Sequence, residues 1–142
     1  MRNASRPLSP HLTIWKWGPH MLVSILHRAT GTALAIGGGI LFTWWLAAAA
    51  AGPSAYASFH YYAVAADPGD GLGFAVNVLA RLVGIGLTWS FFQHLCSGIR
   101  HLVMDTGAGF ELRTNKLGAV ATLVVSITLT ILVWGCILFV RH

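Results

Sequence analysis

Three long apolar segments limit what this chain can fold into more than any other feature of its sequence. They cover about residues 21–51, 72–104 and 117–140, and each exceeds the roughly 20 residues that a helix needs to cross a bilayer. Only 9% of the 142 residues are charged, whereas a soluble domain has about a quarter. The sequence therefore predicts an all-α membrane protein with a single domain, residues 1–142, and three transmembrane helices.

The segments outside these runs predict where the chain meets the membrane surface. Residues 1–20 contain three prolines, which exclude one regular helix, and Trp15, Lys16 and Trp17 are typical of an interfacial anchor. The connection at residues 52–71 is rich in Gly, Pro and Asp, and a short interfacial helix is predicted within it at residues 54–66. Arg81, in the second apolar segment, is expected to extend its guanidinium to the nearer interface.

The basic residues predict the orientation of the chain. The first connection contains no Lys or Arg, whereas basic residues gather on the N-terminal side and around the second connection. They are Arg2, Arg6, Lys16, Arg28, Arg100, Arg113 and Lys116. The positive-inside rule places the N-terminus and the second connection on the cytoplasmic or matrix side, so the first helix begins on the side where the second ends. These residues form no basic stripe with interleaved aromatics, which argues against a nucleic-acid partner.

Small residues recur at every fourth position in two of the segments, which predicts close helix packing. The two rows consist of Ala29, Ala33 and Gly37, and of Ala80, Gly84 and Thr88. The third segment, residues 117–140, carries no charged residue and is expected to act as a scaffold.

A polar stripe crosses the end of the second apolar segment. His94, Gly98, His101 and Asp105 follow the spacing i, i+4, i+7 and i+11, which places them close to one face of a helix. An imidazole at that depth suits haem ligation, a hydrogen bond to a neighbouring helix without a cofactor, or a proton relay, and the spacing does not choose among them. No second histidine lies equally deep, so a six-coordinate haem needs a ligand from another polypeptide.

A second polar group lies at the start of the first apolar segment. Ser24, His27 and Arg28 are three or four residues apart and are predicted to share a helix face. A hydroxyl and a guanidinium at the edge of the hydrocarbon suit a quinone, which has carbonyl oxygens and an apolar tail. The alternative is an ordinary helix start, with a snorkelling arginine and a serine bonded to its own backbone.

Three motifs carry a resemblance to a known family. RPLSPHLTIW (residues 6–15), SILHRATG (residues 24–31) and HLCSGIRHLVMD (residues 94–105) are similar to those of cytochrome b556 subunits. These are the larger membrane anchors of succinate dehydrogenase, or respiratory complex II. The resemblance covers all three apolar segments in order and spacing.

The resemblance implies a haem b shared with a second, smaller membrane anchor subunit. His94 stands where the family's histidine ligates the haem iron, while the second axial ligand comes from the partner. His27 and Arg28 are expected beside the haem propionates, and His101 is expected to contact a propionate or water.

The resemblance also implies a ubiquinone site. Ser24 and Arg28 stand at the family's quinone-binding positions, and Ile25 is the apolar neighbour of the quinone. Succinate oxidation in this family takes place in a flavoprotein subunit, and an iron–sulfur subunit carries the electrons to the anchor. The present chain contains no motif that resembles a flavin site or an iron–sulfur site. No catalytic residue for succinate oxidation is therefore expected in it.

The expected function is thus that of a succinate dehydrogenase anchor, the quinone-reducing part of an enzyme of the tricarboxylic acid cycle and the respiratory chain. Two alternatives remain from the sequence: the anchor of a quinol:fumarate reductase, and a membrane anchor or assembly protein without redox function. The expected location is a bacterial inner membrane, with the mitochondrial inner membrane as the alternative.

Overall fold

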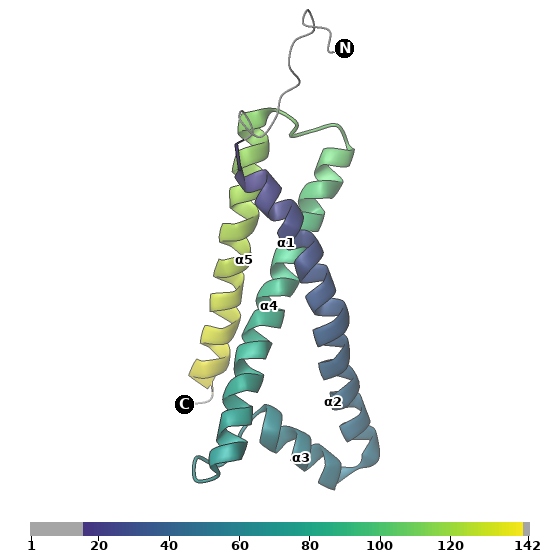
Figure 1. The fold of residues 1–142 in the computed structure, drawn as a ribbon, viewed down its shortest axis with the longest axis vertical. Coiled ribbons are helices and arrows are strands. Elements are labelled where there is room, and N and C mark those ends of the chain that lie inside the picture. The colour runs from purple at the N-terminus through teal and green to yellow at the C-terminus, as the bar shows by residue number, and fades with distance from the viewer. Residues whose placement is uncertain (1–15, 141–142) are drawn as a thin grey trace, which may run out of the picture.

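The computed structural model describes residues 16–140, which form helices and no strand. Helix α1 (Pro19–Ala33) continues through a π-helical turn, η1 (Leu34–Gly38), into α2 (Gly39–Ala51), so these three elements make one span of 33 residues. Helices α4 (Gly71–Asp105) and α5 (Leu112–Val140) are 35 and 29 residues long, and both are apolar enough to cross a membrane. The prediction of an all-α protein with three potential transmembrane helices is confirmed (Figure 1).

Two details of the connections extend the sequence prediction. Helix α3 (Pro53–Ala63) confirms the short helix expected within residues 54–66. The third long helix begins at Leu112, so residues 112–116 are helical although the apolar segment was expected from about residue 117. The motif at residues 6–15 and most of the N-terminal segment 1–20 lie outside the described residues.

Proline and glycine mark the helix boundaries. Pro19 occupies the first turn of α1, where its missing N–H removes no intrahelical bond. Gly52, between α2 and α3, has φ 103°, and Gly107 and Gly109, between α4 and α5, have φ 87° and 79°. Glycine adopts these left-handed values without steric penalty, which permits both sharp reversals of the chain.

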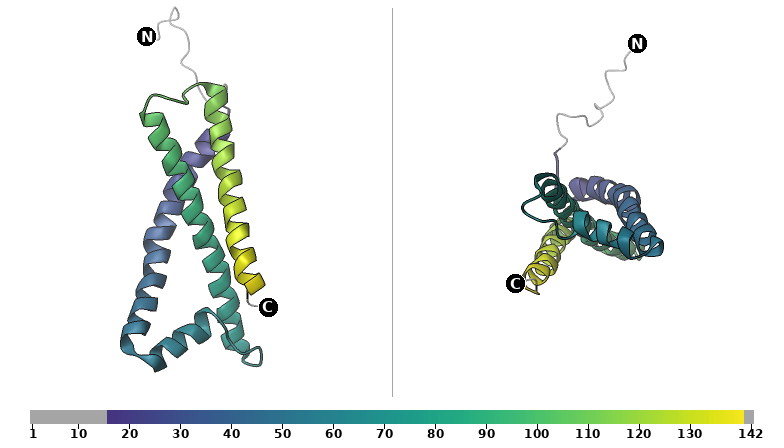
Figure 2. Two further views of the ribbon diagram at one scale, coloured as in Figure 1. Left: turned by 180° about the vertical axis from the view of Figure 1, so that it is seen from behind. Right: turned by 90° about the horizontal axis from the view of Figure 1, so that it is seen from below.

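Helix α4 packs along α5 and is crossed by α1, and the start of α1 also contacts α5 (Figure 1). The start of α1, the end of α4 and the start of α5 meet at one end of the molecule. At the opposite end α2 diverges from α4, and α3 runs across the space between them, as Figure 1 and the view from behind in Figure 2 both show. The two polar segments singled out in the sequence, around Ser24 and His94, therefore belong to the same half of the bundle.

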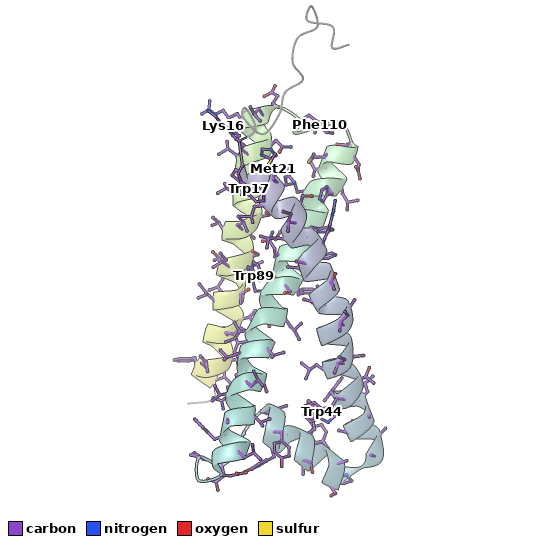
Figure 3. All side chains as sticks on the ribbon, viewed as in Figure 1. Lys16, Trp17, Met21, Trp44, Trp89 and Phe110 are labelled. Carbon is purple, nitrogen blue, oxygen red and sulfur yellow. The ribbon has the colours of Figure 1, made fainter. Side chains whose placement is uncertain are left out.

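The interior of the bundle is polar and its outer surface is apolar. Most of the buried side chains carry a hydroxyl or an amide group. These polar residues are Thr30, Asn77, Ser90, Gln93, Ser97, Thr122, Ser126 and Thr130. Large apolar side chains point outward along the whole length (Figure 3). Such an arrangement suits a lipid environment, in which outward apolar groups need no burial and small interior residues let helices approach closely.

The predicted rows of small residues are only partly contact surfaces. On α4, a Cβ added at Gly84 would lie 3.2 Å from the indole of Trp134 in α5, and the Trp134 Nε1–H donates to Thr88 Oγ1 at 3.2 Å. On the first span, Gly37 approaches Leu87 of α4, whereas Ala29 is exposed. The close approach of α1 to α4 occurs instead at Thr30 and Gly31, one residue further along the helix.

Candidate functional site

His94 projects from α4 against the backbone of α1. A Cβ added at Gly31 would lie 2.9 Å from His94 Cε1 and 3.3 Å from its Nδ1. Only a residue without a side chain leaves space for the imidazole at this position. Gly31 therefore determines how closely the ring approaches α1.

The hydrogen bonds of His94 define which ring nitrogen remains available. Its Nδ1 lies 3.0 Å from the carbonyl oxygen of His27 and 3.5 Å from Thr30 Oγ1. A carbonyl oxygen only accepts hydrogen bonds, so Nδ1 carries the proton and donates it. Nε2 then keeps its lone pair. A histidine that donates one N–H to a backbone carbonyl and offers the other nitrogen to a metal is the common arrangement at metal sites.

His27 completes a cluster of three imidazoles between α1 and α4. Its ring stacks on that of His94, with centroids 4.0 Å apart and planes inclined by 7°. The ring of His101 meets it edge-on at 5.3 Å. His27 Nδ1 lies 2.7 Å from Ser97 Oγ, whose own proton is directed to the Gln93 carbonyl oxygen at 2.6 Å. Ser97 therefore accepts from His27 and fixes the orientation of its ring.

The cluster is not a metal centre made by this chain alone. Among the described residues, no group of three His, Cys, Asp or Glu side chains is arranged to hold a metal ion. The stacked rings of His27 and His94 lie in nearly parallel planes with centroids 4.0 Å apart, so the in-plane lone pairs of their nitrogens cannot converge on one ion. The geometry instead favours one ligand, His94, with His27 and His101 beside it.

The other predicted site residues lie on the outer side of α1. Ser24 is half-buried, Ile25 is 53% exposed and Arg28 is exposed. The prediction that His27 shares a face with Ser24 and Arg28 is only partly right, because His27 turns toward α4 while Arg28 projects outward. Within the described part of the chain, the Arg28 guanidinium has no hydrogen bond or ion pair. It is therefore available to a ligand or to another polypeptide.

Three contributors to the site were not singled out in the sequence. Gly31 makes room for His94, Ser97 orients His27, and the fully buried Gln93 connects α4 to α5 by accepting from Ser126 Oγ at 2.7 Å. The Gln93 Nε2 has no partner among the described residues. In the sequence, Gln93 and Ser97 are two polar residues one helical turn apart inside an apolar segment, and this pattern indicates a buried polar contact.

The fold and this cluster together define a helical membrane protein that holds a group of histidines between its first and second spans, near one end of the bundle. The model of the succinate dehydrogenase/fumarate reductase transmembrane subunit family matches residues 2–133. The chain belongs to this family.

Curated relatives agree with the family match along nearly the whole chain. The succinate dehydrogenase cytochrome b556 subunit of Rickettsia felis is 36% identical over 129 residues, which are 91% of this chain and 90% of the relative. The subunit of the same name from Paracoccus denitrificans is 33% identical over 132 residues, or 93% and 92% of the two chains. The mitochondrial cytochrome b560 subunit of succinate dehydrogenase from mouse is 33% identical over 125 residues, covering 88% of this chain and 68% of the relative.

These similarities confirm two of the sequence predictions. The chain is a membrane subunit of the oxidoreductase class that includes succinate dehydrogenase. It is a membrane protein, and its relatives include bacterial and mitochondrial members. The bacterial relatives favour the inner membrane of a bacterium as its location.

Proposed function

We propose that this chain is the membrane anchor subunit of a succinate dehydrogenase that binds haem b and ubiquinone and delivers electrons from an iron–sulfur subunit to the quinone. The observation that carries the proposal is the environment of His94. Its Nδ1–H donates to the His27 carbonyl oxygen at 3.0 Å, which leaves the lone pair of Nε2 available to a metal. The names of the relatives, cytochrome b556 and b560 subunits, agree with a b-type haem.

The residues present fit a haem held by one ligand from this chain. His94 would supply that axial ligand, and the second would come from the smaller anchor subunit. His27 and His101 would meet the anionic propionates, because they lie beside His94 at the end of the bundle that carries most of the basic residues. Arg28 projects outward from the next position on α1 and would reach a propionate at the outer edge of the site. A bound haem supplies one-electron redox chemistry at its iron.

The quinone site would be formed on the outer face of α1 together with the partner subunits. Ser24 Oγ–H and the Arg28 guanidinium are hydrogen-bond donors one helical turn apart, and each can bind a quinone oxygen. The exposed Ile25 between them would contact the apolar part of the ring or tail. The two donors would bind the oxygens more strongly as these gain negative charge on reduction, because hydrogen bonds to charged groups are the stronger ones.

The orientation and partners follow from the same assignment. The end of the bundle with the histidine cluster would face the cytoplasm, where the iron–sulfur and flavoprotein subunits dock. Protons for quinone reduction would then enter from that side. The concentration of basic residues at this end supports the orientation.

Replacing His94 by leucine tests the haem assignment. In the purified complex, His94→Leu should abolish the reduced-minus-oxidised band of a low-spin b-type haem, because leucine supplies no ligand. His60→Leu is the matched control, since His60 is exposed on α3 at the other end of the bundle. An unchanged band in His94→Leu contradicts the ligand assignment, and a colourless wild-type complex contradicts the haem itself.

Replacing Ser24 by alanine tests the quinone assignment. Ser24→Ala should reduce quinone reductase activity by about 2–12-fold, the effect of one lost hydrogen bond of about 0.5–1.5 kcal/mol. Succinate oxidation with an artificial acceptor should be retained. Ser58→Ala is the control, because Ser58 is exposed on α3 and, among residues 16–140, its hydroxyl bonds only to the Ser54 carbonyl oxygen. Equal losses with both acceptors argue against a quinone contact.

The second candidate function is the anchor of a fumarate reductase. The family description names fumarate reductase beside succinate dehydrogenase, so the fold suits either direction of electron flow. Comparing the succinate-to-quinone and quinol-to-fumarate rates of the purified complex distinguishes the two.

A further inference from the structure

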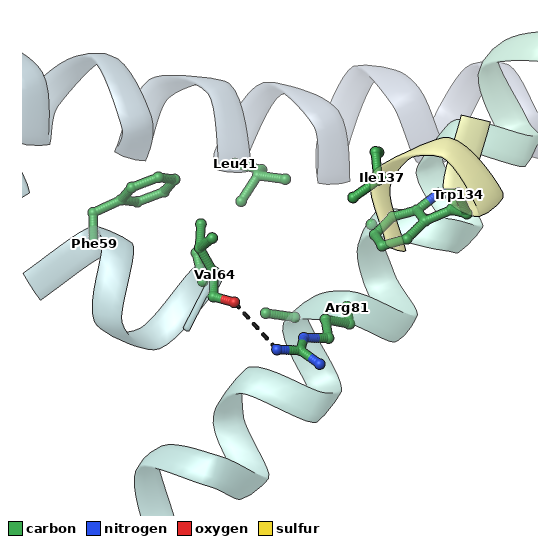
Figure 4. A pocket seen from close by; sticks show the side chains of 9 residues that line it. Leu41, Phe59, Val64, Arg81, Trp134 and Ile137 are labelled. Carbon is green, nitrogen blue, oxygen red and sulfur yellow. Dashed lines mark hydrogen bonds between the residues drawn. The ribbon is translucent and has the colours of Figure 1, made fainter. Parts of the chain in front are cut away.

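An apolar cavity lies in the half of the bundle opposite the histidine cluster. It has a volume of about 290 Å³ and lies under α3, between α2, α4 and the last turns of α5. Leu41, Phe59, Val64, Trp134 and Ile137 form most of its wall (Figure 4). The cavity is open on one side, and its lining is almost wholly apolar, which favours a hydrocarbon occupant over water.

One charged residue, Arg81 of α4, lines this cavity. Its Nη2 donates to the carbonyl oxygen of Val64 at 3.4 Å, just after the end of α3 (Figure 4). This long hydrogen bond uses one of the five N–H donors of the guanidinium. Asp67 and Asp70 in the adjacent connection form no ion pair with Arg81 within the described residues. The arginine thus retains its charge and most of its donors for an anionic group.

The position of Arg81 along α4 places it near the edge of the hydrocarbon. The helix of 35 residues is about 52 Å long at 1.5 Å per residue. The hydrocarbon is about 30 Å thick, so an equal overhang leaves about 11 Å of helix at each end. Arg81 lies ten residues after Gly71, or about 15 Å from the helix start, and its long side chain reaches the headgroup level.

An apolar cavity beside an incompletely satisfied arginine at this depth matches an amphiphile with an anionic head. We infer that the cavity binds an anionic phospholipid, with one acyl chain against Phe59, Trp134 and Ile137 and its phosphate on the Arg81 guanidinium. The planar guanidinium can donate two parallel hydrogen bonds to a phosphate, which suits this headgroup better than a neutral one.

The lipid would complete the contact between α2 and α4, which diverge at this end of the molecule (Figure 1). Within this half, α3 is the element that bridges them. The inference does not depend on the haem or quinone assignment, because Arg81 lies 13 residues, or about 20 Å, from His94 along α4.

The test compares the purified complex with Arg81→Gln and Arg113→Gln variants. Arg113 is exposed at the start of α5, so its replacement removes the same charge away from the cavity. Native mass spectrometry and phospholipid extraction should show a tightly held anionic phospholipid in the wild type and in Arg113→Gln. Its occupancy should fall about tenfold or more in Arg81→Gln, as expected for loss of a charge-assisted hydrogen bond.

A second measurement applies if Arg81→Gln does not assemble. Ala80→Leu keeps the arginine and fills part of the cavity, since Ala80 belongs to its wall. Phosphatidylglycerol micelles added to the delipidated wild-type complex should raise its unfolding temperature more than phosphatidylcholine micelles, and Ala80→Leu should lose this difference. Equal lipid retention in Arg81→Gln and wild type overturns the inference. Recovery of a quinone from the cavity, or its cross-linking to a segment of the partner subunit, also overturns it.

Discussion

The contact between Gly31 and His94 leads to the sharpest prediction. An alanine Cβ at position 31 would lie 2.9 Å from His94 Cε1, whereas an ordinary contact needs at least 3.4 Å, so the ring must move by about 0.5 Å. That movement strains the hydrogen bond from His94 to the His27 carbonyl oxygen. Overpacking costs about 1–3 kcal/mol and a weakened hydrogen bond about 1, while Gly→Ala in a helix returns about 1. We expect a net loss of about 1–3 kcal/mol.

The measurements are the thermal unfolding and the haem spectrum of the purified complex. Gly31→Ala should unfold earlier and show a shifted or diminished b-type band, because the imidazole no longer holds its position. Gly86→Ala is the control: Gly86 lies in α4, and beyond the adjacent backbone of α4 itself an added Cβ there meets no atom of the described residues within 4 Å. This control should be neutral or more stable by about 0.5–1 kcal/mol, the helix-propensity gain.

The unfolding temperature and the haem spectrum together distinguish a displaced His94 imidazole from a general packing defect. If Gly31→Ala matches Gly86→Ala in stability and in spectrum, the Gly31–His94 contact does not hold the imidazole. If stability falls but the spectrum stays unchanged, the contact is structural and His94 is not a haem ligand held by α1.

Two further predictions concern other contacts. Ser126→Ala should destabilise the complex by about 1–3 kcal/mol in thermal unfolding, because it removes the partner of the buried Gln93, whereas Thr128→Ala, at an exposed hydroxyl, should change little. The Tyr61 O–H donates to Asp70 Oδ2 at 2.7 Å, which lowers the pKa of Asp70 and raises the pKa of Tyr61. The stabilising effect of a carboxyl with a lowered pKa is complete above its ordinary pKa of 3.8 and is lost as pH falls through the folded-state value. Hydrogen–deuterium exchange of α3, corrected for the intrinsic pH effect, should therefore accelerate in acid in the wild type but not in Tyr61→Phe; the same acid response in both would refute this role of the contact.

Much of the candidate site could be anticipated from residue spacing. His94 and His101 are predicted to share a face of one helix, and the structure places His101 beside the cluster through its edge contact with His27. The different directions of the His27 and Arg28 side chains, one toward α4 and one outward, could not be anticipated. Neighbouring residues differ by about 100° around a helix, and the sequence does not say which side of the helix faces the core. For the same reason, the predicted contact at Ala29 differs from the observed one, which begins one residue later and involves Thr30 and Gly31.

The sequence by itself determined the class of the protein. Within hydrocarbon every backbone N–H and C=O must be satisfied inside the segment, so three apolar runs of this length form three helices. The low charge and the outward apolar residues follow from the same environment.

Only the tertiary structure decided how the polar side chains are paired. The carbonyl oxygen of His27 selects the protonated nitrogen of His94, and Ser97 orients His27. These contacts depend on how α1 rotates and crosses over α4, which is decided by the shapes of many packed side chains together. A pattern of spacing along one helix carries no information about that rotation. The free Nε2 of His94 is therefore a property of the assembled helix pair.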